Sequence, residues 1–225
     1  MACDSPDPGA AAEVAVNQNC EATITASALL QGTTTCAGPF ELVATDMQGN
    51  TAATGIDLIT IPSAWLGATL QVQITDQTSG NSCMSYIMLV DNLPPVFSAC
   101  PNDTVLCTEP TDPAHVAAVA VADNCDANVD LQSTTSQIGP DCNLPANMIA
   151  VLVRNWTATD DYGNTATCQQ LIYIEKSDLA DVQFPPDLSL DCTAADVSPA
   201  ATGQPTIGGF PVSTFSPCRM IVNHS

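Results

Sequence analysis

The chain has 225 residues, of which 45% are hydrophobic and only 4% aromatic, so it has enough apolar residues for small aliphatic cores in more than one module. Its 24 acidic and 3 basic residues give a formal net charge of −21, which argues against nucleic acid and anionic membranes as partners and favours cations. No apolar run is long enough to span a bilayer, so we expect no membrane insertion.

Taken in chain order, alternating apolar and polar residues predict β-strands at 21–26, 40–45, 69–75, 83–89, 150–159 and 168–174. Single helical turns are expected at 27–32 and 62–67. Gly-Asn pairs mark tight turns, and Pro-Pro pairs mark stiff extended joins. Short strands, regular turn signals and the lack of long helical periodicity predict an all-β protein built of β-sandwiches.

One short sequence occurs twice. Residues 75–90 read TDQTSGNSCMSYIMLV, and residues 159–174 read TDDYGNTATCQQLIYI. In each copy Thr-Asp ends a strand, Gly-Asn supplies the turn, and a cysteine follows on the returning strand. We interpret each copy as the last hairpin of a sandwich, so the chain repeats one kind of module. A third such turn, TDMQGN at 45–50, indicates that the turn alone marks no site.

The Pro-Pro pairs at 94–95 and 185–186 follow the two terminal hairpins. They predict one module at 1–92, a second at 93–177, and the opening half of a third at 178–225. A half-module exposes unpaired strand edges. We therefore expect this third module to be continued in a longer chain or completed by strands from a neighbouring subunit.

Eleven cysteines are dispersed along the chain, none in a CxxC pair, and there are only two histidines. This pattern favours disulfides over zinc and indicates an oxidising, extracellular compartment. Sequence order alone does not fix the connectivity. Position suggests Cys3–Cys20, Cys36–Cys83, Cys107–Cys125, Cys142–Cys168 and Cys192–Cys218, with Cys100 unpaired.

Residues 93–175 carry three motifs in order: CPNDTVLC, then DNC, then W-T-A-T-D-D-Y-G-N ending at a cysteine. Together they resemble the hyalin-repeat (HYR-like) module, an immunoglobulin-like (Ig-like) β-sandwich. Residues 1–92 resemble the companion repeat beside such modules in very large secreted proteins of Bacteroidota-type bacteria. Many members of this family carry a cysteine where this chain has Tyr162, and its loss implies that Cys100 has no partner.

Acidic side chains gather at the turns and at the predicted joins between modules. Calcium prefers six to eight oxygen ligands, which such carboxylates supply. The alternative is that these side chains only cap their own turns. The candidate calcium ligands are Asp76, Asp91, Asp160 and Asp161, with Asp123 and Asp126 in the ADNCD segment.

Three N-glycosylation sequons begin at Asn102, Asn155 and Asn223, of which Asn155 lies in a predicted strand. Asp-Thr-Val at 103–105 resembles the O-glycosylation motif of the same bacterial phylum, with Thr104 as the acceptor. Neither His115 nor His224 lies near a nucleophile motif. We therefore expect no enzymatic activity.

The sequence thus predicts an elongated row of disulfide-stapled Ig-like modules, and the resemblance implies a structural or adhesive segment of a bacterial surface fibre. Its expected partners are neighbouring modules or identical subunits, and surface glycans are a further candidate. Two alternatives are a calcium-dependent module that binds glycans or another ligand, and the accessory domains of a larger secreted enzyme.

Overall fold

The computed structural model describes residues 2–4, 7–31, 38–139, 144–189, 196 and 198–212. The chain divides into two compact units. Unit 1 comprises Met1–Val96, Ala122–Asp130 and Thr159–Thr165, and unit 2 comprises Phe97–Val121, Leu131–Ala158 and Ala166–Ser225. Unit 1 is therefore discontinuous in sequence, because it includes two loops from the later part of the chain. No helix in the described ranges is both long and apolar enough to cross a membrane.

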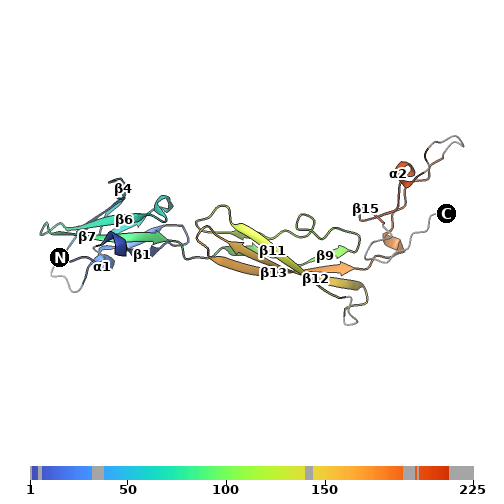
Figure 1. Ribbon diagram of the computed structural model, residues 1–225, viewed down its shortest axis with the longest axis horizontal. Coiled ribbons are helices and arrows are strands. Elements are labelled where there is room, and N and C mark those ends of the chain that lie inside the picture. The colour runs from blue at the N-terminus through green and yellow to red at the C-terminus, as the bar shows by residue number, and fades with distance from the viewer. Residues whose placement is uncertain are drawn as a thin grey trace. The chain divides into compact units, whose positions relative to one another are not determined.

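Unit 1 consists mainly of β-strands (Figure 1). Its elements are η1 (Pro8–Ala10), β1 (Ala12–Ala15), β2 (Ala22–Thr25), α1 (Ala26–Leu29), β3 (Phe40–Thr45), β4 (Thr51–Ile56), β5 (Leu58–Ile61), η2 (Ser63–Trp65), β6 (Thr69–Asp76) and β7 (Ser82–Val90). The predicted strands correspond to β2, β3, β6 and β7, and the two expected helical turns correspond to α1 and η2. Strands β1, β4 and β5 were not predicted.

The two sheets of unit 1 have an immunoglobulin-like strand order. One sheet has the order β1-β7-β6-β3-β4, and β2 pairs with β5 in the other. Strand β1 runs parallel to β7, whereas the β6–β7, β3–β6 and β3–β4 pairs are antiparallel. In immunoglobulin terms, β2 and β5 correspond to strands B and E, and β3, β6 and β7 to strands C, F and G.

Strict alternation along the strands builds the core of unit 1. Every second residue of β6 is buried, and the same pattern runs through the second half of β7. Apart from Asp76, the largest fully buried side chains of this unit are aliphatic: Leu42, Ile59, Ile61, Leu70, Val72, Ile74, Ile87 and Leu89. This agrees with the low aromatic content of the chain.

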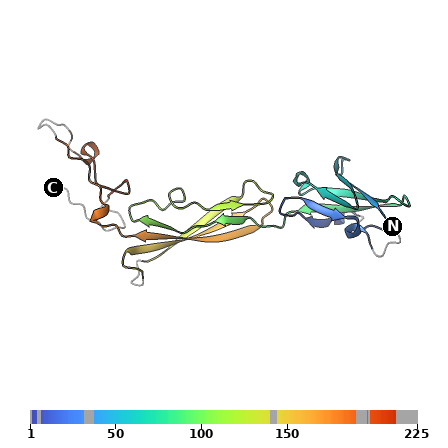
Figure 2. The same cartoon turned by 180° about the vertical axis from the view of Figure 1, so that it is seen from behind.

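The remaining strands belong wholly or mostly to unit 2. They are β8 (Val96–Ala99), β9 (Asp103–Leu106), β10 (Ala120–Ala122), β11 (Asp130–Ile138), β12 (Met148–Thr159), β13 (Thr165–Glu175), β14 (Thr206–Ile207) and β15 (Phe210–Pro211). Short helices lie at η3 (Leu179–Asp181) and α2 (Pro199–Thr202). The main sheet has the order β11-β12-β13-β9, and these strands lie side by side in both views (Figures 1 and 2).

Unit 2 repeats one feature of unit 1. Strand β9 runs parallel to the last long strand, β13, as β1 does to β7. Two smaller sheets pair β8 with β10 and β14 with β15. The fold class predicted from the sequence, all-β with tandem Ig-like, disulfide-stapled modules, is confirmed.

A buried polar contact organises the centre of unit 2. Gln170 on β13 is fully buried and uses both ends of its amide. Its Nε2 donates to the carbonyls of Pro101 (2.9 Å) and Ala117 (2.6 Å), and its Oε1 accepts a bond from Nε1 of Trp156 (3.2 Å). Three chain segments are therefore held by one side chain, whose polar groups would be costly to bury without partners.

The disulfides differ from the positional prediction. Cys3 bonds to Cys83, Cys20 to Cys125, and Cys100 to Cys168. The predicted pairs Cys3–Cys20, Cys36–Cys83, Cys107–Cys125 and Cys142–Cys168 are therefore wrong, and so is the prediction that Cys100 is unpaired. Cys107 is also disulfide-bonded and lies 3.3 Å from Oγ of Ser177.

The parallel pairing of β9 with β13 explains one of these differences. Asp103 pairs with Ile172, so the residues just before them, including Cys100 and Cys168, are brought close. The positional prediction paired cysteines by their order along the chain, whereas the parallel pairing of β9 with β13 brings together two cysteines that are 68 positions apart. Four cysteines, Cys36, Cys142, Cys192 and Cys218, lie outside the described residues, as do Asn223 and His224.

Candidate functional site

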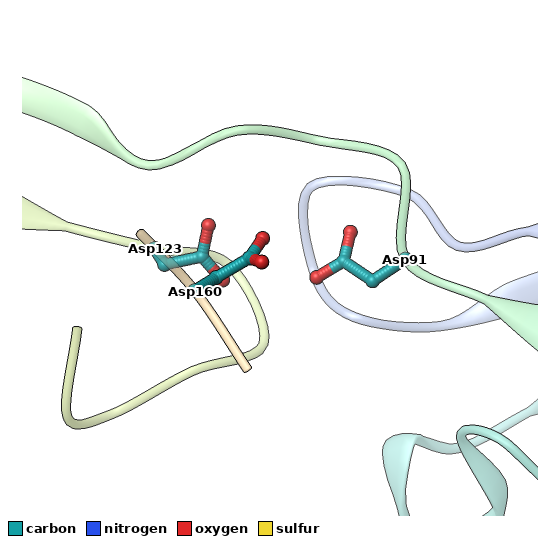
Figure 3. A group of neighbouring side chains, drawn as sticks. All are labelled: Asp91, Asp123 and Asp160. Atoms are coloured by element: carbon teal, nitrogen blue, oxygen red, sulfur yellow. The ribbon is translucent and has the colours of Figure 1, made fainter. Parts of the chain in front are cut away.

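Three aspartates converge within unit 1, and each directly follows the end of a strand. Asp91 follows β7, Asp123 follows β10, and Asp160 follows β12. One carboxylate oxygen from each lies within 4.8 Å of one from each of the others. Figure 3 shows the carboxylates of Asp123 and Asp160 facing that of Asp91. Three separate chain segments therefore bring negative charge to one place.

The repeated Thr-Asp turn positions Asp160. Its Oδ1 accepts backbone bonds from Tyr162 (2.9 Å) and Asn164 (2.8 Å), and its Oδ2 accepts one from Nδ2 of Asn164 (2.8 Å). Asp46 makes the same three contacts with Gln48 and Asn50 in the TDMQGN turn. Asp46 is not part of the cluster, so the turn holds its aspartate in the same way with or without acidic neighbours.

Asp91 is held by hydrogen bonds to both its side chain and its backbone. Its Oδ1 accepts a bond from the backbone N–H of Leu93 at 3.0 Å. Its backbone carbonyl accepts a bond from Nδ2 of Asn164, also at 3.0 Å. The same Asn164 amide therefore contacts both Asp91 and Asp160, and so fixes these two cluster members relative to each other.

Asp123 is held by its own loop. Its Oδ1 accepts backbone bonds from Cys125 and Asp126, both at 2.8 Å. The loop is attached to the remainder of unit 1 by the Cys20–Cys125 disulfide and by a bond from Nδ2 of Asn124 to the carbonyl of Asn17 (3.1 Å). A covalent bond thus keeps Asp123 near residues that precede it by about a hundred positions in sequence.

The cluster contains buried oxygens without hydrogen-bond partners in the described part of the protein. Oδ2 of Asp91 and Oδ2 of Asp123 are such atoms, and so is Oδ2 of Asp126, which lies outside the cluster in the same loop as Asp123. Asp91 is only 3% exposed and Asp160 only 6%. Burying a carboxylate without compensation is costly, and two charges 4.8 Å apart repel by about 3.5 kcal/mol at an effective dielectric constant of about 20. A positive charge bound among these carboxylates would therefore lower the free energy of the arrangement.

Basic side chains do not supply that charge in the described ranges. The one ion pair found there joins His115 and Asp112 of unit 2. Arg154 lies in unit 2, where Nε donates to Oγ1 of Thr135 and the guanidinium lies 5.9 Å from the Trp156 ring. Lys176 also belongs to unit 2. The cluster is accordingly a candidate cation site.

The pKa of Tyr162 is sensitive to the negative charge of the cluster. Burial raises the pKa of the Tyr162 phenol, and the negative charges of Asp91, Asp161 and Asp160 raise that pKa further. Tyr162 is 46% exposed, so its ring lies at the edge of the cluster. A cation bound among the aspartates would change the titration of this phenol.

The structure separates the predicted calcium ligands into two groups. Asp91 and Asp160 lie together in the cluster, which also contains Asp123. Asp76 is buried within its own turn, where it accepts bonds from the Thr78 N–H (2.9 Å) and the Ser79 hydroxyl (2.9 Å). Asp161 is exposed in the turn beside Asp160, and neither Asp76 nor Asp161 belongs to the cluster.

Sequence reasoning considered Asp123 among several acidic residues but did not identify its two neighbours in space. The signal that distinguishes the trio is that each aspartate is the first residue after a strand. Asn164 was missed as a positioning residue, although its motif was recognised.

The candidate modification sites lie in unit 2. Oδ1 of Asn102 accepts the backbone N–H of Leu171 at 2.9 Å, and Thr104 is exposed on β9. Oδ1 of Asn155 on β12 accepts a bond from Nε2 of Gln169. His115 lies 2.8 Å from Asp112, and this hydrogen bond lowers the pKa of the Asp112 carboxyl.

Comparison with known proteins gives only distant likenesses. No family model and no curated protein matches the chain. Among solved structures it is similar to Drosophila N-cadherin EC1-4, with a TM-score of 0.30 and 10% identity over 74% of this chain and 48% of that chain. Human protocadherin-24 EC1-2 gives a TM-score of 0.31 and 10% identity over 79% and 100%.

A third solved structure, human CDH23 EC21-23, gives a TM-score of 0.29 and 15% identity over 76% of this chain and 73% of that chain. The chain thus spans about half the length of the N-cadherin structure. TM-scores this low carry no argument about function, so the site is interpreted from its own residues.

Proposed function

We propose that this chain is a load-bearing, adhesive segment of an extracellular bacterial surface fibre built from Ig-like modules. The observation that carries the proposal is that a disulfide links the leading segment of each repeat to its last long strand. Cys3 bonds to Cys83 on β7, and Cys100 bonds to Cys168 on β13.

These two disulfides shorten the covalent path that carries tension along the chain. Force applied at the ends passes through Cys3–Cys83 and then through Cys100–Cys168. The intervening loops, with sequence separations of 80 and 68 residues, therefore cannot be pulled out even if their sheets open. Cys20–Cys125 is a further covalent link, within unit 1, between its amino-terminal part and the segment Ala122–Asp130. A protein under tension benefits from such limits on its extension.

Other observations support an extracellular setting. Stable disulfides are typical of oxidising compartments. The net charge of −21 keeps neighbouring fibres apart in solution. The resemblance of residues 1–92 to the companion repeat, which occurs beside hyalin-repeat modules in very large secreted proteins of Bacteroidota-type bacteria, supports the bacterial-surface part of the proposal. Neighbouring modules or identical subunits are its proposed partners, and the proposal assigns no catalytic role.

Single-molecule force spectroscopy of the oxidised full chain, held at its two ends, tests the proposal. At about 3.4 Å per residue, full reduction should release at least about 500 Å of additional length, because the loops closed by Cys3–Cys83 and Cys100–Cys168 then extend. An oxidised chain that already unfolds to its full contour length would contradict the proposal. So would the absence of the chain from the surface of cells that produce the full-length protein.

A further inference from the structure

We propose that Asp91, Asp123 and Asp160 bind one calcium ion within unit 1. This inference does not depend on the load-bearing function, because it rests on the local geometry of three carboxylates. A cluster of acidic residues alone would not define a site. Here the buried oxygens without partners provide a second, independent observation.

The spacing of the carboxylates fits one ion. Calcium binds oxygens at about 2.3–2.6 Å, so two ligands on opposite sides of the ion lie about 4.6–5.2 Å apart and all others are closer. The oxygens of the three aspartates lie within 4.8 Å of one another. A single ion can therefore contact all three with at most a small movement of the loops that carry them.

Each carboxylate is oriented in the same way. Oδ1 accepts backbone N–H groups of its own loop: Leu93 for Asp91, Cys125 and Asp126 for Asp123, and Tyr162 and Asn164 for Asp160. This leaves Oδ2 of Asp91 and Asp123 without a hydrogen-bond partner. Oδ2 of Asp160 accepts one bond, from Asn164, and retains a free lone pair. The hydrogen bonds to Oδ1 act as the outer support of a preformed site.

The donor set selects the class of metal. All three ligands are carboxylates, and neither histidine nor a free thiolate belongs to the cluster. Zinc and copper prefer nitrogen and sulfur, whereas calcium and magnesium prefer oxygen. Magnesium demands near-ideal octahedral geometry and releases its water reluctantly, which disfavours a buried site made from three loops. Calcium accepts irregular geometry, with water or backbone carbonyls as its remaining ligands.

The first experiment measures binding by the oxidised full chain after treatment with a chelator. Isothermal titration with calcium chloride at about 0.15 M ionic strength should reveal one saturable site with a Kd of about 1 mM or tighter. Magnesium should bind at least tenfold more weakly. Saturating calcium should raise the Tm of the transition that includes unit 1 by roughly 5–10 °C.

The variants Asp91→Asn and Asp123→Asn test the ligands, because asparagine keeps the Oδ1 acceptor and removes the charge. Each should weaken calcium binding at least tenfold. Each should also raise the Tm of the calcium-free protein, because repulsion in the cluster is reduced. A residue that only caps its loop would not give this combination.

Asp46→Asn is the matched control. It changes the same kind of turn with the same hydrogen bonds as Asp160, away from the cluster. It should leave calcium affinity unchanged, whereas Asp160→Asn should weaken it at least tenfold. Equal affinity in these two variants, or no calcium-dependent rise in Tm in the wild type, would overturn the proposal.

Terbium emission provides a measurement that does not require an aspartate variant to fold. Tyr162 lies beside the cluster, so its excitation should sensitise a terbium ion bound there, and calcium should compete this signal away. Tyr162→Phe should remove most of the emission while leaving calcium affinity in the titration unchanged. Emission that is absent in the wild type, or unaffected by calcium, would contradict the site.

Discussion

Asn164 donates from its Nδ2 to Oδ2 of Asp160 at 2.8 Å and to the backbone carbonyl of Asp91 at 3.0 Å. A single amide thus joins the turn after β12 to the residue that directly follows β7. The Gly-Asn pair, which forms the turn, therefore has a second role in this copy of the motif.

Replacing Asn164 with alanine should destabilise unit 1 by about 1–3 kcal/mol, because two partly buried acceptors lose their donor. The matched control is Asn50→Ala, since Asn50 makes the corresponding bond to Asp46 at an exposed turn. Its cost should be clearly smaller. Urea unfolding of both variants measures the difference, and equal costs would show that the contact to Asp91 contributes nothing.

Removing the Cys20–Cys125 disulfide by a double serine substitution should weaken calcium binding at least tenfold, because the loop that carries Asp123 loses its covalent anchor. It should also destabilise the protein by about 2–4 kcal/mol. The control is the double serine variant of Cys100 and Cys168, a disulfide within unit 2. Titration calorimetry should give this control near-wild-type affinity, and a similar loss in both variants would argue against a local effect.

The alkaline titration of Tyr162 should depend on calcium. Its pKa is raised in the folded protein by burial and by the charges of Asp91, Asp161 and Asp160. The stabilisation from keeping this phenol neutral is complete below its ordinary value near 10 and is lost as the pH rises through the folded pKa. Bound calcium should lower that pKa, as measured by phenolate absorbance against a Tyr162→Phe reference. An unchanged titration would show that the ion binds elsewhere.

The Gln170 contact predicts a large effect in unit 2. Gln170→Ala leaves the Trp156 N–H and two carbonyls without their partner and opens a cavity, which should cost about 2–5 kcal/mol. The neighbouring Gln169 bonds only to Asn155 on the surface, so Gln169→Ala should cost less than about 1 kcal/mol. Chemical denaturation of the two variants tests this ranking.

The sequence predicted the central strands well because each is half buried. Strands β6 and β7 have one face in the core, and their alternation can be read directly from residues 69–75 and 83–89. Strand β11 was missed because nearly all of its residues are exposed, so Ser, Thr and Gln fill both faces without alternation. Strand β4 also lacks a regular buried face.

The disulfides and the cluster depend on contacts that local sequence does not encode. Cys100 bonds to Cys168 because β9 lies parallel to β13. The local sequence of a strand does not indicate which distant strand will pair with it in parallel. Asp123 reaches Asp91 and Asp160 only after two loops have joined unit 1. The sequence identified most of these residues as interesting for their chemistry, but their partners were set by topology.

The disulfide between Cys20 and Cys125, both in unit 1, also imposes an order of events during biosynthesis. Cys20 is synthesised early, yet its partner lies 105 positions later, so its thiol stays available for exchange until the first part of the second repeat, up to Cys125, has been made. The first sheet pairings can form sooner, since they involve only nearby strands. Maturation of the amino-terminal sandwich therefore waits for its successor, and a nascent chain stalled between the two repeats would carry an unmatched sulfhydryl at Cys20.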